Sequence, residues 1–214
     1  MDARTKETIR YLGYGRHAVD DKTLAMIRDS FEELEQIAGR RIICRIFELS
    51  RGEGKCLKLG ELSIESNNLY KNLNGCEEVL MLGATLGTGV DQLIKRYSLM
   101  DMAKAVILQA AAAAMLEEYL DEWQAHMKEK LEAEGKYLRP RFSPGYGDFS
   151  ITHQKKILEM LDAPKKIGLS MTESYMLTPT KSVTAVIGIS RTDMSCHKYG
   201  CEMCGKLDCI YRRN

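Results

Sequence analysis

The chain has 214 residues, and its 31 Lys and Arg against 30 Asp and Glu give a formal net charge of +1. This length can bury a core without disulfide bonds. The balanced charge excludes a broad positive field for nucleic acid or an anionic membrane. Apolar residues make up 44% and charged residues 29%, as in folded globular proteins. Positions 2–7 carry charged residues and show no apolar core of a signal peptide, and no apolar run of about 18 residues occurs. We therefore expect a cytoplasmic protein that binds neither nucleic acid nor membrane.

The first half of the chain predicts alternating helices and strands. Apolar residues recur at steps of three and four over residues 20–39, which predicts a helix with Asp21 as its N-cap and Gly39 as its end. Residues 41–49 are rich in β-branched and aromatic side chains and predict a strand. A second strand is expected at 78–82, followed by a glycine-rich turn over 83–89 and a helix over 90–97. That turn has neither a P-loop lysine nor the dinucleotide glycine spacing, so we interpret it as a structural turn.

The second half predicts one long helix, a rigid loop and a late strand. Residues 101–134 contain no Gly or Pro and consist mainly of helix formers. Their alanine run, 110–114, has little bulk and lets a neighbouring element or a ligand approach the backbone. Two Pro and two Gly within 139–148 predict an irregular loop. A short helix from Thr152, a candidate strand within 168–175 and a strand at 182–189 follow. We expect one α+β domain over residues 1–192 and a cysteine-rich tail over 193–214.

Four side chains suit a ligand that carries both a carboxylate and an ammonium group. Arg141 lies in the Pro/Gly-rich loop, where a guanidinium on a rigid backbone can bind a carboxylate through two hydrogen bonds. Tyr146 is close enough in the chain to stack or to hydrogen-bond. Glu117 and Glu118 follow the alanine run and offer a carboxylate to the ammonium group. The ordinary alternatives are a surface arginine and a solvated helix face.

Two segments resemble the reactivation domain of cobalamin-dependent methionine synthase. Residues 141–148 read Arg-Phe-Ser-Pro-Gly-Tyr-Gly-Asp, and residues 167–184 read Ile-Gly-Leu-Ser-Met-Thr-Glu-Ser-Tyr-Met-Leu-Thr-Pro-Thr-Lys-Ser-Val-Thr. The family pattern is Arg-x-x-Pro-Gly-Tyr, then Ile-Gly-x-x-Leu-Thr-Glu-Ser and Ser-Val, with Met171 here in place of the family's Leu. The resemblance extends over about residues 69–189, and it implies a twisted, mainly antiparallel sheet packed by helices.

The resemblance also implies a function. In that family the domain binds S-adenosylmethionine, whose methyl group passes to cobalamin after one-electron reduction of the oxidised cofactor. Carried over by position, Arg141 holds the ligand carboxylate, Tyr146 lies along the ligand and Glu117 meets its amino group. Ile187 stands where the family usually has an aromatic residue.

The chain differs from a complete methionine synthase. It has no Asp-x-His-x-x-Gly segment for a cobalamin ligand, and it is too short for homocysteine and folate modules. The resemblance therefore implies an accessory component that acts on a corrinoid-bearing methyltransferase and needs an electron donor.

The end of the chain concentrates cysteines. Four of them are separated by four, two and four residues, a spacing that suits one iron–sulfur cluster or zinc ion because thiolates are soft ligands; they are Cys196, Cys201, Cys204 and Cys209. Cys44, Cys56 and Cys76 show no such pattern and are expected as free thiols or apolar fillers. An alternative function follows, namely a metal-binding redox or interaction module with a vestigial ligand pocket, and Ile187 favours it.

Overall fold

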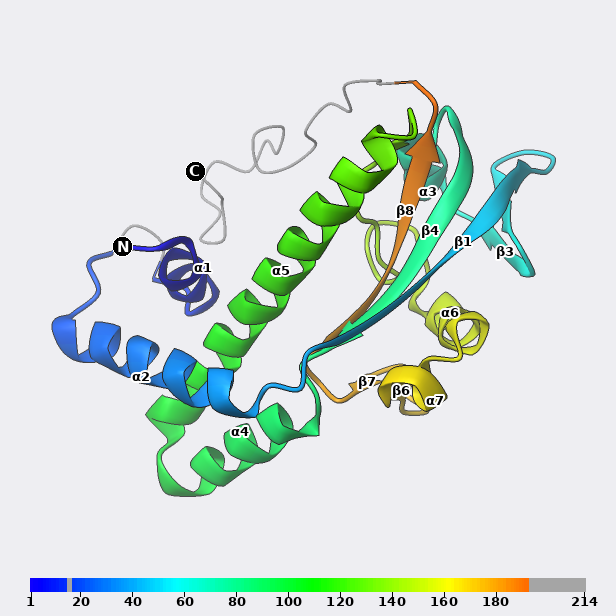
Figure 1. Ribbon diagram of the computed structural model, residues 1–214. Helices are drawn as coiled ribbons and strands as arrows, with labels where there is room; N and C mark the ends of the chain where they lie inside the picture. Colours follow the sequence, from blue (N-terminus) through cyan, green and yellow to red (C-terminus); the bar gives the residue numbers. More distant parts are fainter. Residues whose placement is uncertain (15–16, 193–214) are drawn as a thin grey trace. The chain divides into compact units, whose positions relative to one another are not determined.

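The computed structural model describes residues 1–14 and 17–192 (Figure 1). The chain divides into two units whose segments alternate along the sequence. The first unit contains Met1–Gly39 and Thr88–Asp121, and the second contains Arg40–Gly87 and the described part of Glu122–Cys196. The predicted cysteine-rich tail, residues 193–214, lies outside the described residues.

The first unit is helical. Helix α1 (Ala3–Tyr11) packs against α2 (Asp21–Ile37), and α2 packs against α4 (Thr88–Met100). The predicted long helix is α5 (Met102–Glu132), which runs without a break, and its residues up to 121 belong to this unit. The N-cap of α2 is Asp20, whose carboxylate accepts a hydrogen bond from the Thr23 N–H at 2.7 Å, so the prediction of Asp21 is wrong by one residue. The side chains of Ile9, Ile27 and Ile107 form a small buried core.

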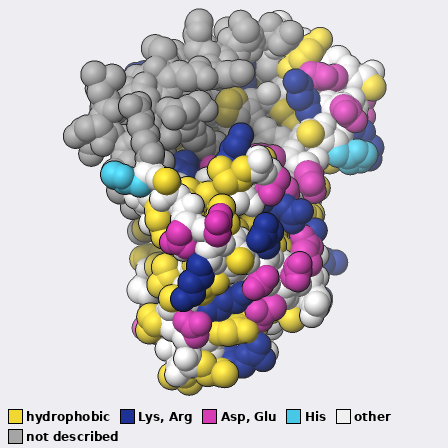
Figure 2. Space-filling model, turned by 90° about the vertical axis from the view of Figure 1, so that its left-hand side faces the viewer, with side chains coloured by type: hydrophobic (Ala, Val, Ile, Leu, Met, Phe, Trp, Pro, Cys, Tyr) yellow, Lys and Arg dark blue, Asp and Glu magenta, His cyan; other side chains and the backbone are white. Residues whose placement is uncertain are grey.

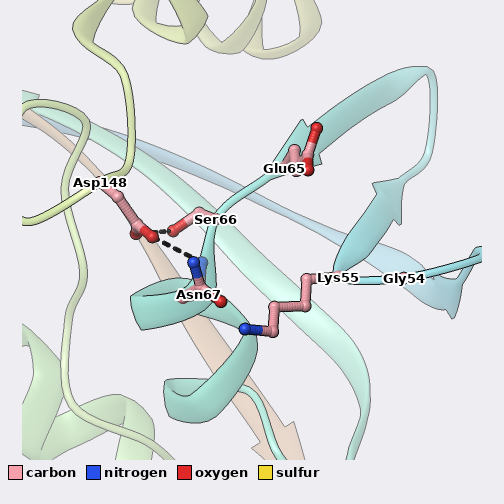
Figure 3. Close-up of a pocket in the computed structure, with 6 residues that line it drawn as sticks. All are labelled: Gly54, Lys55, Glu65, Ser66, Asn67 and Asp148. Carbon is pink, nitrogen blue, oxygen red and sulfur yellow. Dashed lines mark hydrogen bonds between the residues drawn. The ribbon is translucent and has the colours of Figure 1, made fainter.

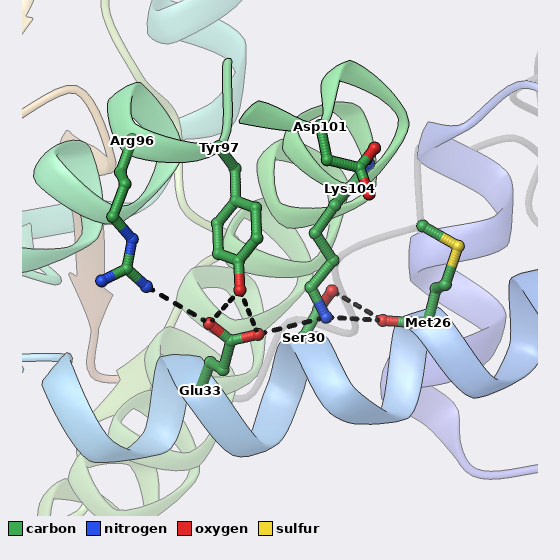
Figure 4. Close-up of polar contacts among 7 residues, drawn as sticks. All are labelled: Met26, Ser30, Glu33, Arg96, Tyr97, Asp101 and Lys104. Atoms are coloured by element: carbon green, nitrogen blue, oxygen red, sulfur yellow. Dashed lines mark hydrogen bonds and ion pairs between the residues drawn. The ribbon is translucent and has the colours of Figure 1, made fainter. Parts of the chain in front are cut away.

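A carboxylate joins three helices of the first unit (Figure 4). Glu33 on α2 accepts hydrogen bonds from the Tyr97 hydroxyl of α4 at 3.0 and 3.1 Å. It also forms an ion pair with the Lys104 ammonium of α5 at 3.3 Å. The Lys104 side chain is 9% exposed, and its ammonium also donates to the Met26 carbonyl at 3.5 Å. Since burying an unpaired ammonium is costly, Glu33 and the Met26 carbonyl compensate Lys104 at this position.

The second unit contains an antiparallel sheet. Among the described residues its strands run in the order β3-β2-β1-β4-β8-β5, and every neighbouring pair is antiparallel. The strands are β1 (Arg41–Arg51), β2 (Cys56–Leu59), β3 (Leu62–Glu65), β4 (Cys76–Thr85), β5 (Tyr137–Leu138) and β8 (Ser182–Ser190). Three of these, β1, β4 and β8, contain the segments predicted as strands. The α+β class and the mainly antiparallel sheet are therefore confirmed.

Short helices and a small hairpin complete the second unit. They are α3 (Asn67–Asn72), the 3-10 turn η1 (Ile151–His153), α6 (Gln154–Leu161), α7 (Ala163–Ile167) and the hairpin of β6 (Ser170–Met171) with β7 (Leu177–Thr178). Helix α6 packs on β1, β4 and β8, and α7 packs on β1 and β4. Of the candidate strand within 168–175, only residues 170–171 pair as a strand.

The alternation of side chains along the strands sorts them between the two faces of the sheet. Val79 and Met81 of β4 belong to the core that also contains the apolar residues of α6 and α7. Leu80 and Leu82 point to the opposite face and are fully buried as well. Strand β4 is therefore buried on both faces, which explains its nearly continuous apolar sequence.

The drawn surface carries side chains of both charges, in line with the formal net charge of +1. On the face drawn in Figure 2, basic and acidic side chains are interspersed among polar and apolar ones. Among the described helices, none combines the length and the apolar character that crossing a membrane requires.

Candidate functional site

The loop that carries Arg141 is attached to the edge of the sheet. The Arg139 N–H donates to the Gly188 carbonyl at 2.8 Å, and Phe142 exchanges two hydrogen bonds of 2.9 Å with Val186 of β8. The ring of Phe142 stacks on the buried ring of Phe149, with centroids 6.2 Å apart. The start of the loop is thus fixed on β8, Phe149 at its end packs in the core against Phe142, and residues 143–148 project between them.

Two glycines shape this projection. Gly145 and Gly147 have φ of +93° and +55°, in the region that favours glycine. A Cβ on Gly147 would also come 2.1 Å from the side-chain amide nitrogen, Nδ2, of Asn68. The Gly145 N–H donates to the Phe149 carbonyl at 2.7 Å, which closes the loop on itself. The rigid loop predicted from Pro and Gly is confirmed.

The carboxylate of Asp148 anchors the tip of the loop to α3 (Figure 3). It accepts hydrogen bonds from the Ser66 hydroxyl at 2.5 Å and from the N–H groups of Asn67 and Asn68 at 2.7 and 3.1 Å. These donors, the Ser66 hydroxyl first, hold the pKa of Asp148 well below its usual range. Asp148 is therefore ionised at neutral pH and ties the loop to the start of α3.

Beside this anchor lies an open pocket of about 480 Å³. Asp148, Ser66 and Asn67 line it together with Gly54, and Lys55 and Glu65 add one charge of each sign. Arg141 and Tyr146 are not among its lining residues. In Figure 3 the carboxylate points to Ser66 and Asn67, so its acceptor capacity is used by the protein itself.

Arg141 and Tyr146 lie in the second unit, on the loop. The Arg141 side chain is half-buried, and its guanidinium donates to the amide oxygen of Gln124 on α5 at 2.8 Å. This contact orients the guanidinium. Tyr146 is 67% exposed, which leaves its ring available to a ligand.

The carboxylates of α5 belong to the first unit. Glu117 is half-buried on α5. Its neighbour Glu118 forms an ion pair with the Arg4 guanidinium of α1 at 3.2 Å, so that carboxylate has a structural partner. Most of the alanine run before it is buried, which agrees with close packing of α5.

A buried side-chain amide that the sequence analysis did not single out connects the turn at Tyr175 to strand β8. The Gln154 amide nitrogen donates to the Tyr175 carbonyl at 2.8 Å, and its oxygen accepts from the Thr184 hydroxyl of β8 at 3.2 Å. Gln154 and Thr184 are 4% and 1% exposed. Tyr175 has a φ of +62°, and Gln154 therefore holds a turn with an unfavourable backbone conformation. Its place at the start of a short helix gave no signal in the sequence.

The other residues singled out from the sequence have structural surroundings. Ile187 is fully buried in β8 opposite Leu80. The predicted turn over 83–89 is shorter in the structure, because 83–85 belong to β4 and 88–89 to α4. Gly89 has a structural role, since a Cβ there would be 2.9 Å from the Ile37 carbonyl oxygen of α2. Cys44, Cys56 and Cys76 are free thiols.

The described residues hold no cluster of three or more His, Cys, Asp or Glu side chains with the geometry of a metal site. The predicted metal ligands Cys196, Cys201, Cys204 and Cys209 lie outside the described residues. Their prediction therefore rests on their spacing.

Comparison with known proteins gives one family and one fold. The model of the family described as "Vitamin B12 dependent methionine synthase, activation domain" matches residues 72–207, more than half of the chain. Among solved structures, the chain is similar to the MetH reactivation domain bound to AdoHcy, with a TM-score of 0.63 and 15% sequence identity. The alignment covers 92% of this chain and 79% of that one, and at this identity the similarity shows the fold. A search of curated proteins found no match.

Proposed function

Because this chain belongs to the family of vitamin B12 dependent methionine synthase activation domains, we propose that it binds S-adenosylmethionine and supports the reductive methylation of a corrinoid on a partner methyltransferase. The similar solved structure binds AdoHcy, which is the product that remains when S-adenosylmethionine has lost its methyl group. The partner's corrinoid supplies the cobalt chemistry, and a separate donor supplies one electron. The contribution of this chain is to bind and orient the methyl donor.

The observation that supports this proposal most directly is the fixed loop around Arg141. Hydrogen bonds to β8, the Phe142–Phe149 contact and the Asp148 anchor hold its backbone. A guanidinium on such a loop loses little conformational entropy when it binds a carboxylate. In this proposal Arg141 binds the carboxylate of the ligand and Tyr146 lies against its sulfonium, where an aromatic face favours a cation. Glu117 is the proposed partner of the amino group.

The proposed function includes a metal centre in the tail. Cys196, Cys201, Cys204 and Cys209 are the proposed ligands of an iron–sulfur cluster or a zinc ion, and their spacing supports this. An iron–sulfur cluster would fit a reaction that consumes an electron. The alternative, a metal-binding redox or interaction module, keeps this centre and predicts that S-adenosylmethionine does not bind.

Calorimetric titration with S-adenosylmethionine tests the binding step. Arg141→Ala is expected to weaken binding by about 1.5–3 kcal/mol, the usual contribution of a hydrogen bond to a charged group, which is about 10- to 150-fold in Kd. Arg191→Ala is the matched control, because the Arg191 side chain is 69% exposed and pairs only on the surface with Glu77. No heat at millimolar ligand with the wild-type chain would refute the proposal and favour the redox module.

A second experiment tests the reaction. A corrinoid protein in the Co(II) state is mixed with a chemical reductant and S-adenosylmethionine, and methylcobalt absorbance is followed with and without this chain. The wild-type chain and Arg191→Ala are expected to accelerate its formation, and Arg141→Ala to accelerate it less. Equal rates with and without the chain would contradict the proposed role even if the ligand binds.

A further inference from the structure

The hydrogen bonds that hold the loop around Arg141 fix its backbone and not its side chain. The residues near it on either side, Arg139 and Phe142, are bonded to β8 through their backbone groups. These contacts place the Cα of Arg141, whereas rotatable bonds separate Cα from the guanidinium. A long basic side chain loses much rotamer entropy when its head group is held in one place. A ligand therefore binds this guanidinium more tightly if another group of the protein has already restricted the side chain.

Gln124 on α5 is such a group. Its amide oxygen accepts a hydrogen bond from Nη1 of Arg141 at 2.8 Å, across 17 residues of sequence. A guanidinium has only donors, so the oxygen of the amide, and not its nitrogen, faces Arg141. Both side chains are partly buried, and both residues belong to the second unit. The contact therefore holds the far end of a side chain whose backbone is already fixed.

The hydrogen bond to Gln124 is compatible with ligand binding. A carboxylate that accepts two parallel hydrogen bonds uses one edge of a guanidinium. Gln124 accepts from Nη1, so this contact does not itself occupy the edge formed by Nε and Nη2. Arg141 can thus be oriented by Gln124 and bind a carboxylate at the same time.

The type of side chain at position 124 also fits this role. Residues 117–134 contain seven acidic side chains and one glutamine, and the glutamine is the residue whose contact with Arg141 is described above. A glutamate at this position would bring a carboxylate of the protein to the guanidinium, where it would form an ion pair and compete with the carboxylate of the ligand. An amide orients the guanidinium without that competition.

We propose that Gln124 is a positioning residue of the S-adenosylmethionine site, which holds the guanidinium of Arg141 in place for the carboxylate of the ligand. This inference rests on the proposed function, because Gln124 acts on the ligand only through Arg141. Its contribution has two parts. It reduces the side-chain entropy that Arg141 loses on binding, and it does so without placing a carboxylate of the protein at the guanidinium.

Calorimetric titration with two ligands tests this role. The ligands are S-adenosylmethionine and its decarboxylated analogue, which lacks the group that Arg141 binds. Gln124→Met keeps the length of the side chain and removes the acceptor, and it is expected to raise the Kd for S-adenosylmethionine about 3- to 10-fold, the usual effect of one long side chain that is ordered on binding. Gln124→Glu is expected to raise this Kd about 10-fold or more, because two carboxylates then compete for Arg141.

The analogue separates this role from a general structural one. Neither substitution is expected to weaken binding of the analogue, since it makes no contact that depends on the orientation of Arg141. Both ligands carry a net positive charge, so a negative charge at position 124 that acted only at long range would strengthen their binding. Weaker binding of S-adenosylmethionine to Gln124→Glu therefore reports on the guanidinium.

Two further measurements complete the experiment. Gln109, the other glutamine of α5, is exposed, and Gln109→Met and Gln109→Glu are expected to leave both Kd values unchanged. In a chain that already carries Arg141→Ala, Gln124→Met is expected to have no further effect on the Kd for S-adenosylmethionine, because the group it positions is gone. Circular dichroism verifies that each variant keeps the fold of the wild-type chain.

The possible results distinguish this inference from the proposed function. If Arg141→Ala raises the Kd for S-adenosylmethionine and both Gln124 substitutions leave it unchanged, the positioning role is overturned and the proposed function stands. Equal weakening of the two ligands by the Gln124 substitutions would also overturn the positioning role, and so would an undiminished effect of Gln124→Met in the Arg141→Ala chain. A wild-type chain that does not bind S-adenosylmethionine would overturn the proposed function and this inference with it.

Discussion

Gln154 is predicted to be a main stabilising contact between the hairpin of β6 and β7 and the sheet. Gln154→Met keeps the length of the side chain and removes both polar atoms. The Thr184 hydroxyl, which is 1% exposed, then loses its acceptor, and the Tyr175 carbonyl loses its donor. We expect the variant to fold with a lower free energy of unfolding.

The two lost contacts set the size of the effect. A buried hydroxyl left without a partner costs about 1–3 kcal/mol, and an ordinary hydrogen bond contributes about 0.5–1.5 kcal/mol. The Tyr175 carbonyl lies in a partly exposed turn and regains water, so only the ordinary value applies to it. Gln154→Met is therefore expected to lower the free energy of unfolding by about 2–4 kcal/mol, measured by urea denaturation at neutral pH.

A double-mutant cycle isolates the buried pair. Thr184→Val alone leaves the Gln154 oxygen without its donor, and the double variant removes both partners. Since replacing both partners with apolar groups avoids a stranded polar atom, the double variant is expected to lose about 1 kcal/mol less than the two single losses combined. Strictly additive losses, or a loss below about 0.5 kcal/mol for Gln154→Met, would refute this account.

Three further predictions concern charge and metal. Because the folded-state pKa of Asp148 is lowered, its hydrogen bonds to Ser66 and α3 stabilise the fold fully above the ordinary pKa of 3.8, and this stabilisation is lost as the pH falls toward the folded-state pKa. Asp148→Asn is therefore expected to be less stable than the wild-type chain at neutral pH. The difference between their urea midpoints should shrink below about pH 4. Glu33→Gln removes the ion-pair partner of a nearly buried ammonium and is expected to lower the free energy of unfolding by about 1–3 kcal/mol, whereas Glu77→Gln, at an exposed pair, should change it by less than about 0.5 kcal/mol. Protein purified without oxygen is expected to be brown and to lose its colour when Cys201 and Cys204 are replaced by Ser. Colourless protein with stoichiometric zinc would reject the iron–sulfur centre. Metal-free protein with four titrating thiols in the tail would reject both metals.

Periodicity and composition predicted the longer elements. The spacing of apolar residues gave α2, the absence of Gly and Pro gave α5, and the β-branched run gave β1. These segments are long enough for local preferences and burial to agree. The loop over 139–148 was also predictable, because proline and glycine restrict the backbone wherever they occur.

The small elements and the contacts between distant segments were not predictable. The hairpin of β2 and β3 consists of two four-residue strands, too short for a periodic signal. The role of Asp148 depends on Ser66, which lies 82 residues away in the sequence. Gln154 joins Tyr175 to Thr184 only in the folded chain. Arg141 and Tyr146 were found because they belong to a motif, whereas the polar groups that hold their surroundings in place belong to none.

The order of strands in the sheet also bears on how the chain folds as it is synthesised. Strand β4 is buried on both faces, and one of its edges is completed by β8, about 100 residues later in the sequence. At a synthesis rate of about 5–20 residues per second, β4 waits for roughly 5–20 s before its partner has been made. During that time a strand that is buried on both faces in the folded protein has an open edge, which is the kind of segment that aggregates or recruits chaperones. The nascent chain is therefore most vulnerable between the synthesis of β4 and that of β8, and slower translation of this interval would lengthen the exposure.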